Sequence, residues 1–301
     1  MNVYEIITER ILGKLEEGTV PWRKPWQGGE VGIPRNLQTG QPYRGINVFL
    51  LAAAGYASPY WLTFRQAKQR GGSVRSGEHG TPVVLWKWHH AREQDAENGR
   101  NRRRIPFLRY YTVFNTSQCD ALVIPATSMP PQREFSPITR CEEVVAGMPD
   151  APVIESGRTR AAYLPARDTV IMPARSAFES AEAYYQTIFH ELAHATGHER
   201  RLGRPAVTDT AAFGSHAYSR EELVAEMGAA FLCGHAGIKA ATLENAASYI
   251  DGWLRVLRGD SRMVVQAAAH AQKAADFILG HTSESASGMA EDELGDAAQV
   301  A

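Results

Sequence analysis

The stretch IFHELAHATGHER, residues 188–200, decides how the second half of this 301-residue sequence is interpreted. It contains His190, Glu191 and His194 in the pattern HExxH, inside an otherwise apolar run. Residues four apart lie on one face of a helix, so the two histidines can bind one zinc ion while the glutamate reaches a water molecule. Burying these side chains without a partner would be costly. We therefore predict one Zn2+ per chain, with His190 and His194 as ligands and Glu191 as the general base of peptide-bond hydrolysis.

A catalytic zinc site needs a third protein ligand. His198 continues the helical ladder, but it lies at or beyond Gly197, where the helix should end. The extended pattern HExxHxxGxxH would need a histidine at position 200, where this chain has Arg200, and this argues against the metzincin class. A ligand from a later helix is the better candidate.

The stretch SREELVAEMGAAFL, residues 219–232, supplies three acids, Glu221, Glu222 and Glu226. Its spacing is similar to that of glutamate-type zincins, in which the first acid of an ExxxE pair is the ligand and the second supports a ligand histidine. We therefore expect Glu222 as third ligand and Glu226 as the supporting residue, although Glu226 remains an alternative ligand. Ser219 and Glu222 also fit a capping box, which would need no metal.

Two further elements would complete a peptidase site. Tyr218 and His216 precede the acidic helix and are candidate donors to the oxyanion. An edge strand formed by RAAYLP or DTVIMP, residues 160–165 and 168–173, could hold an extended peptide.

Composition excludes several classes of protein. With 44% hydrophobic and 22% charged residues, the chain resembles a globular protein. The three cysteines are far apart, which argues against a disulfide framework or a thiolate metal site. No apolar run reaches the length of about 18 residues that a membrane span needs, and the first residues lack the layout of a secretory signal. We therefore predict a cytoplasmic protein without a membrane partner.

Charge is divided unevenly along the chain. Residues 1–140 hold 19 Lys and Arg against 11 Asp and Glu, whereas the remaining residues hold 13 against 22. Five of the six tryptophans lie in the basic half, interleaved with its cations. Cations that follow phosphates and aromatic rings that stack on bases bind single-stranded nucleic acid. The basic half is therefore a candidate nucleic-acid-binding module, although each single aromatic residue is better explained as part of the core.

Periodicity predicts an α+β fold. We expect helices in residues 4–18, 45–56, 58–72, 180–196, 219–233, 244–258 and 263–279, and strands in 81–88, 106–115, 151–156, 160–165 and 168–173. The third helix could start at Ser58 or at Thr63, and the first two strands are expected to pair. The proline-rich stretch after residue 124 suggests a domain boundary. The predicted units are a mixed helix and small-sheet domain in 1–125, a linker in 126–150, a mostly helical domain in 151–280, and a disordered acidic tail in 281–301.

Motifs along nearly the whole chain carry a family resemblance. They are IITERILGKLEEGTVPWRKPW (6–26), IPRNLQTGQPYRGINVFLL (33–51), YWLTFRQAKQRGGSVRSGEHGTPVVLWKW (60–88), YYTVFNTSQCD (110–120), HELAHATGHERRLGR (190–204), SREELVAEMGAAFL (219–232) and SYIDGWLRVLRGD (248–260). The first four resemble the N-terminal domain of the ArdC antirestriction family, DNA-binding proteins of conjugative plasmids, phages and related mobile elements. The last three look like the zincin-like metallopeptidase domain that accompanies it.

The resemblance implies single-stranded DNA as a partner, protection of incoming DNA from restriction, and a protein substrate that the motifs do not identify. The DNA-contacting residues expected from it are Trp22, Arg23, Lys24, Trp26, Arg44, Arg65, Lys68 and Arg75. Two other interpretations stay open. The chain could be a regulatory zinc protease whose basic half docks proteins, or a non-catalytic DNA-coating protein in which the metal is structural.

Overall fold

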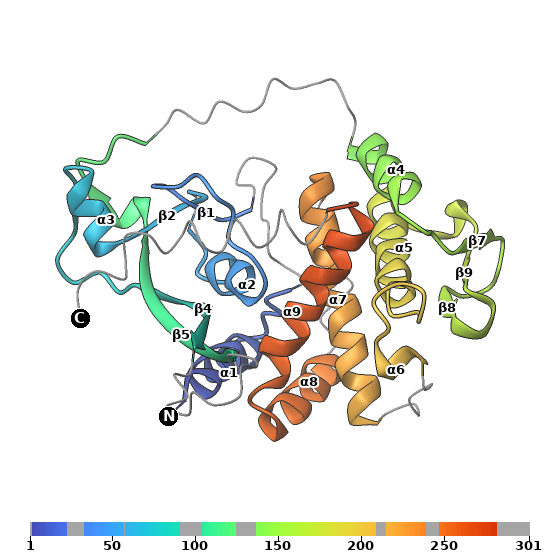
Figure 1. Ribbon diagram of the computed structural model, residues 1–301. Coiled ribbons are helices and arrows are strands. Elements are labelled where there is room, and N and C mark those ends of the chain that lie inside the picture. The colour runs from blue at the N-terminus through green and yellow to red at the C-terminus, as the bar shows by residue number, and fades with distance from the viewer. Residues whose placement is uncertain are drawn as a thin grey trace, which may run out of the picture.

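The computed structural model describes residues 2–22, 33–56, 58–90, 104–124, 137–208, 215–238 and 247–281, and the structural statements below refer to these residues. They form the predicted α+β fold, in which helices dominate the second half (Figure 1). The helices are α1 (Val3–Glu16), α2 (Ile46–Ala52), α3 (Phe64–Gln69), α4 (Pro137–Gly147), α5 (Ala181–Ala195), α6 (Pro205–Thr208), α7 (His216–Ala236), α8 (Ala247–Gly259) and α9 (Met263–Ile278). The strands are β1 (Arg35–Asn36), β2 (Tyr60–Thr63), β3 (Ser73–Val74), β4 (Thr81–His90), β5 (Arg104–Asn115), β6 (Cys119–Asp120), β7 (Val153–Ser156), β8 (Ala162–Leu164) and β9 (Thr169–Met172).

The first half is built on a four-stranded sheet in the order β1-β2-β5-β4, with a separate β3-β6 pair. The two strands expected in 81–88 and 106–115 are β4 and β5, and they pair in antiparallel fashion from Thr81 opposite Val113 to His90 opposite Arg104. The helix expected in 58–72 starts at the N-cap Thr63, the second of the two predicted starts, and not at Ser58. Residues Tyr60–Thr63 form β2 instead, since they pair with β5, and α3 begins only at the capping box of Thr63 and Gln66.

The second half places a three-stranded sheet, in the order β7-β9-β8, beside helix α5 (Figure 1). Helix α7 packs against both α5 and α9. Gly228 allows α7 and α5 to approach closely, because a Cβ added there would lie 3.0 Å from the Cβ of Ala193. Helix α7 begins earlier than predicted, with Ser215 as its N-cap, so Ser219 lies inside the helix and the capping-box interpretation is wrong.

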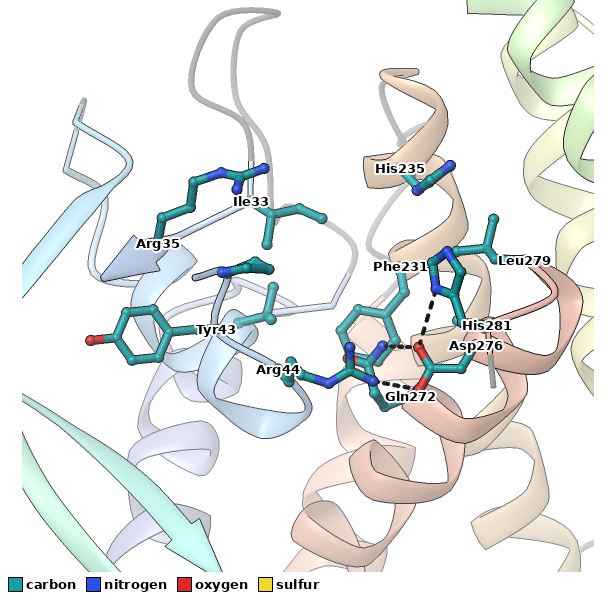
Figure 2. Close-up of a pocket in the computed structure, with 13 residues that line it drawn as sticks. Ile33, Arg35, Tyr43, Arg44, Phe231, His235, Gln272, Asp276, Leu279 and His281 are labelled. Atoms are coloured by element: carbon teal, nitrogen blue, oxygen red, sulfur yellow. Dashed lines mark hydrogen bonds and ion pairs between the residues drawn. The ribbon is translucent and has the colours of Figure 1, made fainter. Parts of the chain in front are cut away.

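The two halves share one hydrophobic core. Phe49 stacks on Phe231 with ring centroids 4.8 Å apart, and Trp22 meets Trp253 edge to face at 5.8 Å. Polar contacts add to the junction, because Arg44 forms an ion pair with Asp276 beside a cavity of about 380 Å³ between the halves (Figure 2). These contacts fix the basic half against helices α7, α8 and α9.

The domain limits stay a prediction. Residues 126–136 of the expected linker lie outside the described ranges, while α4 occupies 137–147 and packs with α5 and α7. The acidic tail also lies outside the described residues from position 282 onward. Among the described helices, none combines the length and apolar character that crossing a membrane requires.

Candidate metal centre

Helix α5 presents both motif histidines on one face. Its N-cap is Ser180, whose hydroxyl accepts a hydrogen bond from the amide of Ala183. The intervening apolar residues Phe189 and Leu192 are fully buried, which fixes the rotation of the helix. As a result, the Nε2 atoms of His190 and His194 lie 3.1 Å apart, one helical turn from each other.

Helix α7 brings the carboxylate of Glu222 to the same point. Its two oxygens lie 3.6 Å from the Nε2 atoms of His190 and His194, respectively. Tetrahedral zinc, with ligands at about 2.1 Å, separates neighbouring ligand atoms by about 3.4 Å. The three side chains therefore fit one metal ion, and their ligand atoms all lie within 4.8 Å of one another.

The charges at this point favour a cation. Burial alone would raise the pKa of Glu222, but the hydrogen bond from His190 and the charge of His194 outweigh it and lower the pKa to about 2. Burial alone would lower the pKa of His190, but the hydrogen bond to Glu222 and the charge of Glu191 raise it. A divalent cation at this point would take over the stabilisation of the ionised carboxylates of Glu222 and Glu191.

Glu191 is buried beside the metal-binding side chains. Its Oε2 accepts a hydrogen bond of 2.8 Å from the amide of Tyr163 in β8. Glu191 lines a cleft of about 470 Å³ together with His190, His194 and Glu222. The edge strand expected beside this cleft is β8, from RAAYLP, because β9, from DTVIMP, lies in the middle of its sheet.

The residue behind His194 is Glu221, which the ExxxE spacing does not single out. The Oε1 of Glu221 lies 3.4 Å from the Nδ1 of His194 and accepts a 2.6 Å bond from the buried Arg204. Arg204 also donates to the carbonyl of Ala193 and to the hydroxyl of Thr196, so it ties Glu221 to helix α5. Glu226, which was expected to support a ligand histidine, acts on His190 through its charge.

Three candidate residues remain, Tyr218, His216 and His198, and of these Tyr218 alone is among the residues that line the cleft. Tyr218 lines the cleft, and burial together with the charge of Glu222 raises its pKa to about 12. His216, the alternative oxyanion donor, lies instead 3.5 Å from Asp260. His198, the alternative metal ligand, lies beyond the end of α5, where its Nδ1 accepts a hydrogen bond from the amide of Arg200.

The expected DNA-contacting residues that the structure describes differ in burial and in pairing. Trp22 is 1% exposed and belongs to the core, so its assignment to DNA is wrong. Arg44 is paired with Asp276, and Arg75 is paired with Glu78 and Asp120. Arg65 and Lys68 are exposed on α3. The remaining three, Arg23, Lys24 and Trp26, lie outside the described residues.

Two family models match the chain. Residues 1–114 match the N-terminal domain of anti-restriction factor ArdC, and residues 140–270 match a zincin-like metallopeptidase. The uncharacterized protein y4eC of Sinorhizobium fredii is 36% identical over 293 residues, which cover 94% of this chain and 93% of that protein. A DNA primase, TraC of Escherichia coli, is 36% identical over 92% of this chain, but the match spans only 27% of the primase.

Solved structures agree with these matches. The metal-free crystal structure of the antirestriction protein ArdC from plasmid R388 has 35% sequence identity and a TM-score of 0.72, over 97% of this chain and 99% of that one. Its Mn(II)-bound form has 36% identity and a TM-score of 0.71, over 93% and 98% of the two chains. Similarity of this extent, in sequence and in fold, places the chain in the ArdC family of antirestriction proteins, with an ArdC-type N-terminal domain and a zincin-like metallopeptidase domain.

Proposed function

We propose that the chain binds single-stranded DNA through its first half and hydrolyses peptide bonds through a zinc centre in its second half, in a protein that protects DNA from restriction. The observation that carries the peptidase part is the convergence of His190, His194 and Glu222 beside Glu191. Two imidazoles and one carboxylate with an adjoining cleft are the ligand set of catalytic zinc, whereas structural zinc sites have four protein ligands. The Mn(II) in the related ArdC structure makes manganese the competing metal.

The residues of the cleft divide the chemistry among them. His190, His194 and Glu222 would hold the ion, which supplies a Lewis acid for a peptide carbonyl when bound. Glu191 takes a proton from the attacking water molecule and delivers it to the departing amine. Tyr218, whose hydroxyl stays protonated at neutral pH, donates a hydrogen bond to the oxygen on which charge develops. Strand β8 forms one rim of the cleft and would orient the substrate backbone.

The peptidase part of the proposal is tested first by measuring metal content and then by measuring proteolysis. Purified chain should contain about one zinc per molecule, measured by elemental analysis after incubation with zinc and manganese together. His194→Ala and Glu222→Gln should lose the metal. Glu191→Gln should keep the metal and lose cleavage of labelled casein, whereas Glu199→Gln, an exposed control just beyond α5, should change neither property.

Three outcomes would count against the peptidase. If the purified chain takes up neither zinc nor manganese, the proposed metal centre is wrong. Casein cleavage that survives Glu191→Gln would show a contaminating protease or a different base, and a retained metal without any cleavage would favour the structural role.

Single-stranded DNA is supported as partner by the ArdC-type domain, by the similarity to part of a DNA primase, and by the excess of cations in residues 1–140. The full chain should bind a labelled oligonucleotide with an affinity that falls as salt rises, because bound cations release counterions from the phosphates. Binding that is absent at low salt would remove this half of the proposal while leaving the metal centre untouched.

A further inference from the structure

The sheet of the first half and helix α3 carry a strong excess of positive charge. In residues 58–90 and 104–124, the described part of the chain holds seven Lys and Arg but only two acids, Glu78 and Asp120. Both acids are paired with Arg75, at 2.7 Å and 3.5 Å. The surface of this unit away from Arg75 therefore has little negative charge to repel a phosphate.

Two large aromatic rings lie open on the same unit. Phe64, the first residue of α3, is 48% exposed, and Tyr110 of β5 is 49% exposed. Side chains alternate along a strand, so Tyr110 and Phe114 lie on the same side of β5, whereas Val113 lies on the other side. The ring of Phe64 meets that of Phe114 edge to face at 6.4 Å, which places all three rings along one strip of the sheet.

Cations lie directly beside this strip. The Nζ of Lys68 lies 4.9 Å from the centre of the Phe64 ring, one turn along α3, and the exposed Arg65 follows Phe64 in sequence. Tyr110 and Phe114 are four residues apart, which is about 13 Å along a strand. The strip is therefore long enough for several bases, with cations along its α3 end.

We infer that single-stranded nucleic acid lies across this strip, which we call the α3–β5 face and define as Phe64, Arg65, Lys68, Tyr110 and Phe114. The inference rests on the proposed function, because it says where the DNA partner binds. Open rings stack on unpaired bases of any sequence, and adjacent cations neutralise phosphates. A duplex keeps its bases stacked on one another and would gain only the cations. The face replaces Trp22, Arg44 and Arg75 as the binding surface and retains Arg65 and Lys68.

The face lies far from the metal centre. Figure 1 shows α3 and β5 on one side of the molecule and α5 with β8 on the other. Substitutions on the face should therefore change DNA binding without changing metal content, which provides an internal control for folding.

Fluorescence anisotropy with a short labelled oligonucleotide, using the full chain, tests the inference. Phe64→Ala and Tyr110→Ala should each weaken binding roughly 5- to 100-fold through lost stacking, with the dependence on salt unchanged. Lys68→Gln should instead lower the slope of log affinity against log salt by about 0.7. Val153→Ala and Arg158→Gln, exposed residues of the second half, should bind as the parent chain does.

The outcomes separate the inference from the proposed function. If the parent chain binds and both aromatic variants bind equally well, the face is wrong while DNA binding stands. If a duplex of the same length binds as tightly as the single strand, and the two aromatic variants lose as much affinity for the duplex, the proposed stacking on unpaired bases is wrong. If the parent chain fails to bind any oligonucleotide, the proposed DNA partner fails together with the face. Phe64 also packs on Phe114, so Tyr110→Ala is the variant to rely on if Phe64→Ala loses its metal or its melting transition.

Discussion

At the scale of single residues, Glu221 is the group that should decide how firmly His194 holds a metal. Its carboxylate lies between His194 and the buried Arg204. Glu221→Gln should weaken metal binding about 10- to 100-fold, because the imidazole loses its orienting partner. It should also lower the free energy of unfolding by about 3–5 kcal/mol, since Arg204 is left buried and unpaired. Competition with a chelator and urea unfolding measure the two effects. Glu226→Gln is the matched control, and a larger loss of metal in that variant would return the supporting role to Glu226.

The sequence located the centre but not its supports. HExxH on a helix places His190 and His194 by geometry alone. Glu221 and Glu222 are neighbours, and only the rotation of α7 against α5 decides which of them reaches the ligand atoms. Trp22 was misplaced for a similar reason. Its surroundings in the sequence are polar, and the ring that covers it, Trp253, is far away along the chain.

At the scale of elements, the end of α5 depends on close packing at Gly197. The sequence indicates a helix stop there, but the structure shows a tighter constraint, because a Cβ would lie 2.5 Å from Val207 and 3.1 Å from Arg204. Gly197→Ala should therefore displace α6 and cost about 1–3 kcal/mol of stability. Gly13→Ala, in the last turn of α1 with open space around it, should instead be neutral or stabilising by up to about 1 kcal/mol. Thermal unfolding of both variants checks the contrast. An unchanged unfolding midpoint in Gly197→Ala would mean that α6 moves aside without a cost in stability.

The turn between β8 and β9 should make the stability of the peptidase half depend on acid. Asp168 accepts two 2.8 Å bonds from Arg201 and one from the hydroxyl of Tyr163. Burial alone would raise the pKa of Asp168, but these hydrogen bonds outweigh it and lower the pKa. The ionised form of Asp168 therefore stabilises the fold at pH values above the ordinary pKa of about 4. This stabilisation is lost as the pH falls through the lowered pKa that Asp168 has in the folded state.

Asp168→Asn isolates that contribution. Asparagine tolerates the left-handed backbone at this position, where φ is 45°, so the variant removes the charge without new strain. We expect it to lower the free energy of unfolding by about 1–3 kcal/mol at neutral pH. The difference from the parent chain should shrink below about pH 4, as followed by urea unfolding across pH. A difference that stays constant down to the lowest pH would show that shape, and not charge, holds the turn.

At the scale of the whole molecule, composition and motif order predicted the fold class and family, whereas the joining of the halves could not be predicted. The charge division along the chain suggests two independent units. The structure packs α1 against α8 and α2 against α9, through contacts between residues more than 200 positions apart. No local pattern encodes such pairing, because an apolar helix face only signals that something covers it.

The shared core leads to a last prediction, that both halves lose their structure in one transition. Trp22 is almost fully buried against Trp253, so Trp22→Ala should lower the free energy of unfolding by about 3–5 kcal/mol. Because the cavity opens between the halves, the loss should extend to the metal centre, although no atom of Trp22 belongs to it. Circular dichroism and release of bound metal, followed together during heating, should shift by the same temperature interval. Tyr110→Ala, which removes a half-exposed ring, should leave both curves in place. Metal release that keeps its parental midpoint in Trp22→Ala, while part of the helical signal melts early, would show instead that the halves unfold separately and that their contact contributes little to the peptidase domain.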